Sequence, residues 1–184
     1  MAIRTVTGGT GGSFDYSAGW KELTISNAKY GNHSGTKFID IWFQDYPENL
    51  NVRAYAVVNK KTKEEFRIAN WFKFSNSGIQ EVIDNGSGKP VITYDDDPEN
   101  LVGSKVNVFF YKVQKEIDGE LREFARMWRE PAPVEMDTDN MNFNEKDVTY
   151  WKGRAEKSYD TFKELKNGYG SSESPNNSSD KVPF

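Results

Sequence analysis

The chain has 184 residues, no cysteine, one histidine and a net charge of −4. Without cysteine it has no disulfide, no thiolate metal site and no cysteine nucleophile, which fits a reducing cytoplasm. The negative charge argues against a protein that holds a polyanion by bulk attraction, so any nucleic-acid site must be a local patch. No apolar run has the length of a signal or membrane segment, and we expect a cytoplasmic protein without a membrane partner.

Residues 1–18 are rich in glycine, threonine and serine, and we expect them to form a flexible lead. The domain that follows, residues 19–131, opens with three predicted strands. These strands cover residues 20–25, 37–45 and 51–59. In the second and third strands aliphatic side chains alternate with polar or aromatic ones, so one face of each strand is expected to enter the core.

Residues 64–83 change to a helical period. Aromatic residues such as Trp71 and Phe74 suit one face of a helix, with an expected break or end near Ser77 and Gly78. The Gly-rich stretch that follows stops the helix, and an acidic loop with three consecutive aspartates comes next.

Residues 105–115 and 120–129 alternate cleanly and flank a turn at Ile117-Asp118-Gly119, which predicts a β-hairpin. Three strands, a helix and two strands are the element order of an OB-fold, a five-stranded Greek-key barrel with a helix between strands three and four. Several small α+β folds share this order. The predicted class is therefore mainly β with minor α, with the OB-fold as the expected architecture.

The composition changes after residue 131. Residues 132–147 are acidic and are expected to form a linker. Residues 148–166 predict a helix because apolar side chains recur near 3.6 spacing, although Gly153 lowers its stability. Residues 167–184 are rich in serine and asparagine, and a segment with so little to bury is expected to be a disordered tail.

The sequence gives little support for catalysis, and we expect no enzyme activity, no metal and no cofactor. His33 lies in a dense Gly-Asn turn that explains its presence, and no Cys/His cluster is available for zinc. The carboxylates at 95–99 lack the ligand spacing of a calcium loop. Neither Gly-rich stretch, 8–12 or 85–89, has the context of a phosphate-binding loop.

Rings and arginines share the strand faces opposite the aliphatic ones. Rings stack on bases without regard to sequence, and guanidinium groups follow phosphates, so this mixture is typical of single-stranded nucleic-acid sites. The candidate DNA-binding residues are Trp42, Arg53, Tyr55, Phe109, Tyr111, Arg122, Phe124, Arg126, Trp128 and Arg129. The alternative is that roughly half of these rings pack in the core. Arg122, Arg126 and Trp128 are the hardest to bury.

The chain ends in an aromatic residue beside its own α-carboxylate. A hydrophobic ring with a terminal carboxylate, at the end of a disordered tail, suits a basic-rimmed pocket of a partner protein. The predicted partner-binding residues are Asp180, Val182, Pro183 and Phe184. The alternative is a frayed terminus that happens to end in phenylalanine.

Three stretches of the domain resemble the phage-encoded OB-fold single-stranded-DNA-binding proteins. They are residues 23–37, with the Ser34-Gly35 turn, Asn70-Trp71-Phe72-Lys73-Phe74 ahead of Gly78, and residues 101–108 before the final hairpin. Together they lie within residues 20–131. The resemblance implies sequence-independent binding of single-stranded DNA during bacteriophage DNA replication or recombination, in the cytoplasm of an infected bacterium.

The C-terminal tip resembles that of bacterial single-stranded-DNA-binding proteins, which end in Asp-Asp-Ile-Pro-Phe and recruit replication and repair enzymes. The tail here departs from that pattern because it is far less acidic. The leading hypothesis is a non-catalytic protein that coats single-stranded DNA and recruits replication or recombination proteins. The alternatives are a protein–protein adaptor or virion component with an OB-like barrel, and a single-strand annealing protein.

Overall fold

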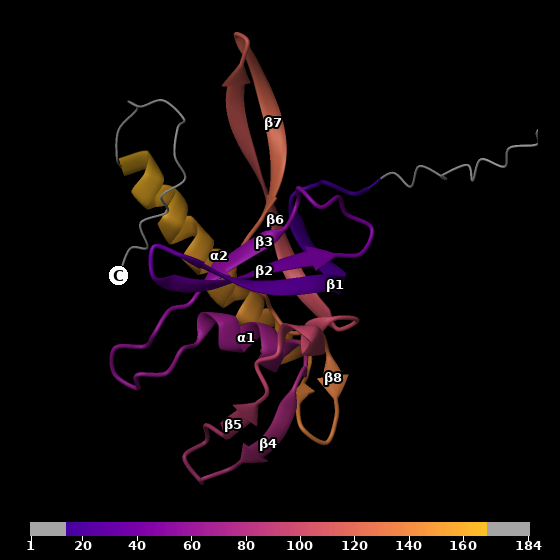
Figure 1. The fold of residues 1–184 in the computed structure, drawn as a ribbon, viewed down its shortest axis with the longest axis vertical. Coiled ribbons are helices and arrows are strands. Elements are labelled where there is room, and N and C mark those ends of the chain that lie inside the picture. The colour runs from indigo at the N-terminus through magenta and orange to yellow at the C-terminus, as the bar shows by residue number, and fades with distance from the viewer. Residues whose placement is uncertain (1–13, 169–184) are drawn as a thin grey trace, which may run out of the picture.

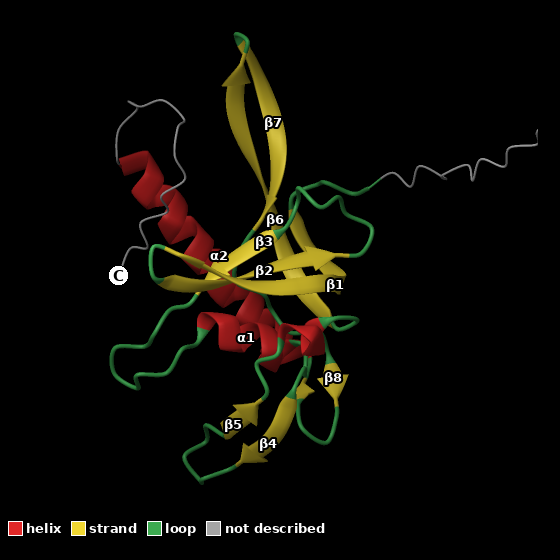
Figure 2. Cartoon of the chain, viewed as in Figure 1, coloured by secondary structure: helices red, strands yellow, loops and turns green. Residues whose placement is uncertain are grey.

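A curved antiparallel sheet organises the protein (Figures 1 and 2). The structure is a computed structural model that describes residues 14–168. Its main sheet has five strands in the order β3-β2-β1-β6-β7. The strands are β1 (Gly19–His33), β2 (Thr36–Phe43), β3 (Val52–Tyr55), β6 (Lys105–Ile117) and β7 (Glu120–Met127). The predicted partner-binding residues Asp180, Val182, Pro183 and Phe184, and most of the predicted lead, lie outside the described residues.

The strand β1 connects the two halves of the sheet. Its first part, Gly19 to Thr24, pairs with β6, and its second part, Ile25 to His33, pairs with β2. The register shifts between Ile25 and Asn27, and a bulge of this kind bends a strand and increases its twist. The long first strand therefore produces the curvature of the sheet, where the sequence predicted a strand of only six residues, 20–25.

The expected closed barrel is wrong. Closure requires the first and last strands of the order, β3 and β7, to pair, and within residues 14–168 the sheet is open between them. The short length of β3, four residues, leaves little edge for a partner strand. On the other side, β6 and β7 continue beyond the sheet as a projecting two-stranded arm (Figure 1).

The aliphatic faces predicted for the second and third strands form the core. Ile39 and Ile41 of β2 and Val52 and Ala54 of β3 are almost fully buried, together with Val106, Val108 and Phe110 of β6. The helix α1 (Arg67–Phe74) closes this core with Ile68, Trp71 and Phe72. Because alternate residues point to opposite faces, Phe109 lies on the outer face of the sheet, the face opposite the core.

The helix expected within residues 64–83, with a break or end near Ser77 and Gly78, is α1, and it is shorter than that. It ends at Phe74 because Asn76 and Gly78 adopt left-handed backbone angles, with φ of 53° and 65°. A side chain at Gly78 would also collide with the carbonyl oxygen of Asp95. The residues that follow form β4 (Ile79–Ile83), which pairs with β5 (Val91–Tyr94). The 3₁₀-helix η1 (Pro98–Leu101) comes next.

The predicted linker at 132–147 contains regular structure. It includes β8 (Met136–Asp137), paired with β9 (Asn142–Phe143), and the buried side chains of Met141 and Phe143 pack on Phe74. The apolar residues within this acidic stretch, such as Ala132, Met141 and Phe143, are buried. The helix predicted at 148–166 is confirmed, and α2 (Glu145–Gly168) starts three residues earlier.

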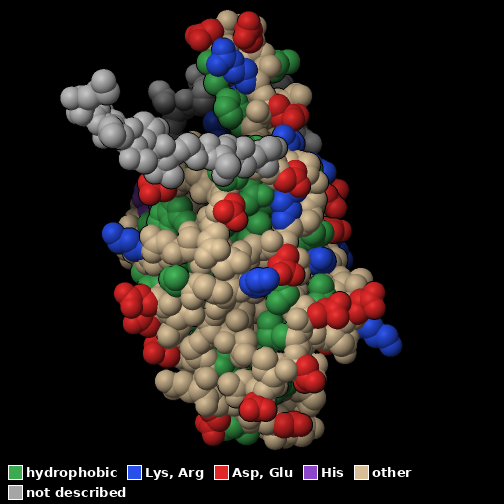
Figure 3. Space-filling view, turned by 90° about the vertical axis from the view of Figure 1, so that its right-hand side faces the viewer, with side chains coloured by type: hydrophobic (Ala, Val, Ile, Leu, Met, Phe, Trp, Pro, Cys, Tyr) green, Lys and Arg blue, Asp and Glu red, His purple; other side chains and the backbone are tan. Residues whose placement is uncertain are grey.

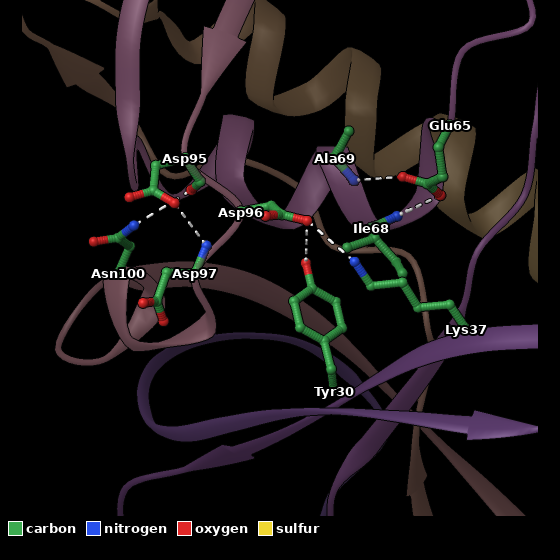
Figure 4. Close-up of polar contacts among 9 residues, drawn as sticks. All are labelled: Tyr30, Lys37, Glu65, Ile68, Ala69, Asp95, Asp96, Asp97 and Asn100. Carbon is green, nitrogen blue, oxygen red and sulfur yellow. Dashed lines mark hydrogen bonds and ion pairs between the residues drawn. The ribbon is translucent and has the colours of Figure 1, made fainter.

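Both helices have side-chain caps. The carboxylate of Glu65 accepts a hydrogen bond from the backbone N–H of Arg67 at 2.8 Å. It also accepts from those of Ile68 and Ala69, at 2.9 and 3.0 Å (Figure 4). It also accepts one from Val57 at 3.1 Å, so a single side chain joins the end of β3 to the start of α1. At α2 the side chain of Asn144 accepts from the backbone N–H groups two and three residues ahead.

Replacing Glu65 with alanine removes the acceptor of four backbone N–H groups. We expect Glu65→Ala to lower the free energy of unfolding by about 1–2 kcal/mol, the size of a lost helix cap. Urea unfolding measures it. Glu64→Ala is the control because Glu64 is exposed and its side chain caps nothing. Equal losses in the two variants would contradict the capping role.

Candidate nucleic-acid interface

The outer face of β2 and β3 holds the first group of predicted site residues. Arg53 donates from Nε and Nη2 to the two carboxylate oxygens of Asp40, at 2.8 and 2.7 Å. Its guanidinium also lies 4.0 Å from the ring centroid of Phe38, which contacts Tyr55 edge-on at 5.5 Å. The paired carboxylate raises the pKa of Arg53. In this conformation the Arg53 guanidinium is therefore held in place and is already paired with Asp40.

Glycine and tryptophan complete this surface. Gly31 of β1 lies opposite Phe38, and a Cβ at Gly31 would overlap the Phe38 ring. The absence of that Cβ lets the ring lie flat across β1. Trp42 is half-buried, and its indole N–H donates to the carbonyl oxygen of Glu48 at 3.0 Å, which fixes the ring. Trp42 and Tyr55 thus keep part of their ring surface open to solvent.

The outer face of β1, β6 and β7 carries a second set of rings, which we call the ring platform. Its members are Trp20, Phe109, Tyr111 and Trp128. The helix α2 covers it: the Tyr159 ring centroid lies 5.4 Å from Phe109, 4.8 Å from Tyr111 and 5.4 Å from Trp128. Phe162 adds a contact with Trp128 at 5.3 Å.

Trp128 departs most from its predicted environment. The sequence predicts that Trp128 is hard to bury, but only 2% of it is exposed, beneath α2. Trp20, which the sequence analysis missed, pairs directly with Phe109 across the strands. The signal was present in the sequence, because Tyr159 and Phe162 belong to the apolar stripe of the predicted helix and that stripe needs a surface to pack on.

The arm provides the third group. Opposed residues of an antiparallel pair share a face, so Tyr111, Val113, Lys115 and Ile117 lie with their β7 partners on one side, which we call the arm face. Those partners are Arg126, Phe124, Arg122 and Glu120. The arm face therefore holds three cations, two rings and one carboxylate.

The opposite side of the arm is different in charge. It carries Lys112 with the carboxylates of Glu116 and Glu123, and Lys112 pairs with Glu123 at 3.3 Å. On the arm face, Arg122 makes only an exposed 3.5 Å contact with Glu120. The projection shows cationic and hydrophobic side chains next to each other, with acidic side chains around them (Figure 3). Positive charge is therefore concentrated on the same side as Phe124.

A buried charged cluster lies between α1, α2 and the segment after β7. Arg67 is 8% exposed and contacts Glu130 at 3.6 Å, and Ser158 of α2 donates to the same carboxylate oxygen at 2.9 Å. Arg129 stacks on the Trp128 ring at 4.7 Å. Burial lowers the pKa of Arg67, and the nearby charge of Arg129 lowers it further. Sequence reasoning missed Arg67 because it appeared only as a helical residue.

The acidic loop at 95–99 is held by neighbouring side chains. Asp96 accepts from Lys37 at 3.1 Å and from the Tyr30 hydroxyl at 3.4 Å, with the Lys37 ammonium 3.8 Å from the Tyr30 ring centroid (Figure 4). Burial, with help from Asp96, raises the pKa of Tyr30. Asp97 caps η1 by accepting from the N–H of Glu99. Within residues 14–168 no group of three or more histidines or carboxylates is arranged to hold a metal ion.

The comparisons with known proteins add no relative. The chain matches no family model, no curated protein and no solved structure. In the part of the chain that the structure describes, neither helix combines the length and apolar character needed to cross a membrane. The candidate site consists of three surfaces, which are the outer β2–β3 surface, the covered ring platform and the open arm face.

The bidentate geometry of Arg53 gives a stability prediction. Arg53→Lys keeps the charge but loses the planar fork that satisfies both oxygens of the largely buried Asp40, so we expect a loss of about 1 kcal/mol in unfolding free energy. Arg122→Lys changes an exposed contact and should stay within about 0.5 kcal/mol of the original protein. Urea unfolding compares the two, and a larger effect at Arg122 would contradict the assignment.

Proposed function

We propose that this protein binds single-stranded DNA without sequence preference and without catalysis, and that the arm face carries the binding. The observation that supports this most is the alternation along one side of β7. Arg122 and Arg126 flank Phe124 on the same face, and Lys115 lies opposite Arg122. A ring between two guanidinium groups can stack on a base while the cations contact the flanking phosphates.

The strand order supports an OB-type architecture for this site. The order β3-β2-β1-β6-β7, with α1 after β3, is that of an OB Greek key without the closing pair. OB-folds bind oligonucleotides on the face of strands two and three and on the loops 1–2 and 4–5. The corresponding surfaces here are the outer β2–β3 face, with Trp42, Arg53 and Tyr55, and the arm. We therefore assign both surfaces to one DNA path.

The net charge of −4 is compatible with this function because the cations are segregated. The arm face carries more positive than negative side chains, and its opposite side carries more negative ones. Base stacking supplies roughly 1–3 kcal/mol per base and does not depend on charge. The binding should weaken with salt, but only in proportion to a small number of phosphate contacts.

The cellular role follows from the resemblance noted in the sequence. We assign the protein to DNA replication or recombination of a bacteriophage, in the host cytoplasm. Recruitment of partner proteins through Asp180, Val182, Pro183 and Phe184 rests on the sequence alone, because these residues lie outside the described part.

A second candidate is a protein–protein adaptor. It is favoured by Leu121, which is 72% exposed close to the tip of the arm and is unsuited to phosphate. Salt separates the two functions, because DNA binding weakens as salt rises and an apolar contact does not.

The arm face is tested by removing its guanidinium groups. We expect Arg122→Ala/Arg126→Ala to raise the Kd for labelled oligo-dT at least tenfold and to reduce the salt slope by about 1.4, since each single-strand phosphate contact contributes about 0.7. Fluorescence anisotropy over a salt series measures both. The control Lys105→Ala/Lys112→Ala removes the same charge from elsewhere on β6 and should change little. Equal losses in both double variants would show that bulk charge, and not the arm face, determines affinity.

Phe124 tests the stacking contribution separately. Phe124→Ala should weaken binding by about fivefold to a hundredfold, the equivalent of one lost stack, and leave the salt slope unchanged. The same anisotropy titration applies. A variant that binds as tightly as the original protein would remove Phe124 from the site.

A further inference from the structure

The ring platform has the chemistry of a single-strand site, yet α2 covers it. Two tryptophans, a phenylalanine and a tyrosine lie together there, and Arg129 stacks on Trp128. They continue the row of side chains on the arm face, because Tyr111 belongs to both. The covered platform and the open arm face are thus adjacent parts of one outer surface.

Several buried donors near α2 lack acceptors. Among the described residues, Nε and Nη1 of Arg67, Nε of Arg129 and Nε1 of Trp128 are buried without a hydrogen-bond partner. Glu130 is the carboxylate that pairs with Arg67, and it is shared with Ser158. Buried donors without partners are costly, and each one calls for an explanation. A ligand rich in anionic oxygen acceptors would satisfy all of them.

The two halves of α2 are held differently. In the first half, Trp151 packs on Phe74 at 4.9 Å, within the cluster that includes Met141 and Phe143. The second half, residues 154–166, reaches the platform mainly through the rings of Tyr159 and Phe162. Gly153 separates the halves and has open space around it. Glycine costs a helix about 1 kcal/mol relative to alanine, so the helix is weakest at this point.

Polar contacts between the second half and the sheet are few and exchangeable. The Trp20 indole N–H donates to Glu156, and Ser158 donates to Glu130. Both are contacts that water could replace once the helix moved. Ala155 of this half is also buried, and its remaining surface is largely exposed, including Leu165 at 46%. This half therefore covers the platform through a limited apolar contact.

We propose that residues 154–166 of α2 are a displaceable cover, and that single-stranded DNA bound on the arm face extends onto the uncovered ring platform. The strand would stack bases on Trp20, Phe109 and Trp128 and place phosphates against Arg67 and Arg129. This inference rests on the proposed DNA binding and adds a second, closed section to that site. Because the platform is covered in this conformation, the apparent affinity is reduced by the fraction of molecules that are open.

Hydrogen exchange on the full-length protein tests the movement directly. Saturating oligo-dT of increasing length should leave the amides of residues 145–152 protected and raise exchange in residues 154–166 once the oligonucleotide is long enough to pass the arm. A short oligonucleotide should protect the arm alone. Unchanged or slower exchange in 154–166 with every length would overturn the cover.

Variants test whether the cover competes with DNA. Tyr159→Ala/Phe162→Ala removes its ring contacts and should lower the Kd for long oligo-dT about tenfold, with stronger tryptophan quenching from Trp20 and Trp128. Leu165→Ala, on the same half of the helix, should change neither. Added to the Tyr159→Ala/Phe162→Ala variant, Phe109→Leu should return the Kd for long oligo-dT toward its original value. In the original protein, Phe109→Leu should have little effect on the Kd for a short oligonucleotide. Weaker binding by a folded Tyr159→Ala/Phe162→Ala variant would overturn the proposal.

The outcomes distinguish this inference from the function on which it depends. If the original protein binds no oligo-dT at low salt, the proposed DNA binding itself is wrong. If it binds, and Arg122→Ala/Arg126→Ala abolishes binding while exchange in 154–166 never changes, the DNA function stands and the cover is wrong. Circular dichroism confirms that each variant keeps its fold before its affinity is compared.

Discussion

The outer face of the sheet carries more aromatic surface than the helix α2 covers. This difference shapes the rest of the molecule. A phenylalanine, tyrosine or tryptophan side chain buries about 150–250 Å² when it packs. Each Å² of apolar surface removed from water stabilises the fold by about 25 cal/mol. The second half of α2 satisfies that tendency over the ring platform through Tyr159 and Phe162. It leaves the outer β2–β3 surface and the arm face open. Those open surfaces, and not the core, define where a flat ligand can bind.

Ion pairs are also distributed unevenly between the body of the sheet and the arm face. Arg53 is matched by Asp40, and Lys37 by Asp96, so these two cations on the body of the sheet have partners. On the arm face, Lys115 and Arg126 make no ion pair with a described carboxylate, and Arg122 has only a long exposed one. Beneath α2, guanidinium donors remain without acceptors. An acidic protein can in this way present positive charge locally, next to rings, which is the combination that the proposed binding of a single strand requires.

Local patterns predicted the fold well where they were strong. Alternation predicted the hairpin at 105–129 and the core face of β2, and the helical stripe from Val148 to Phe162 predicted α2. Two features defeated sequence reasoning. The first helix was expected to break or end near Ser77 and Gly78, but residues 79–83 were assigned to the same helical period and form the strand β4 instead. The prediction of a closed barrel was wrong because closure requires β3 and β7 to pair, and β3 has only four residues.

The candidate site was predicted in part. Register placed Phe109, Tyr111, Phe124 and Arg126 on one face, as alternation required. The burial of Trp128 was only partly predictable, because the apolar stripe of the predicted helix indicates that the helix packs on a surface but not that the surface includes Trp128. Arg67 was missed because only the tertiary fold brings it beside Arg129 and Glu130.

Ultraviolet crosslinking of the full-length protein to oligo-dT, followed by mass spectrometry of the peptides, tests the central claim most directly. The account predicts crosslinks to the arm around Phe124 and Tyr111 and to the outer β2–β3 surface around Trp42 and Tyr55. Crosslinks confined to the β4–β5 hairpin, on a part of the molecule that shares none of these residues, would contradict it.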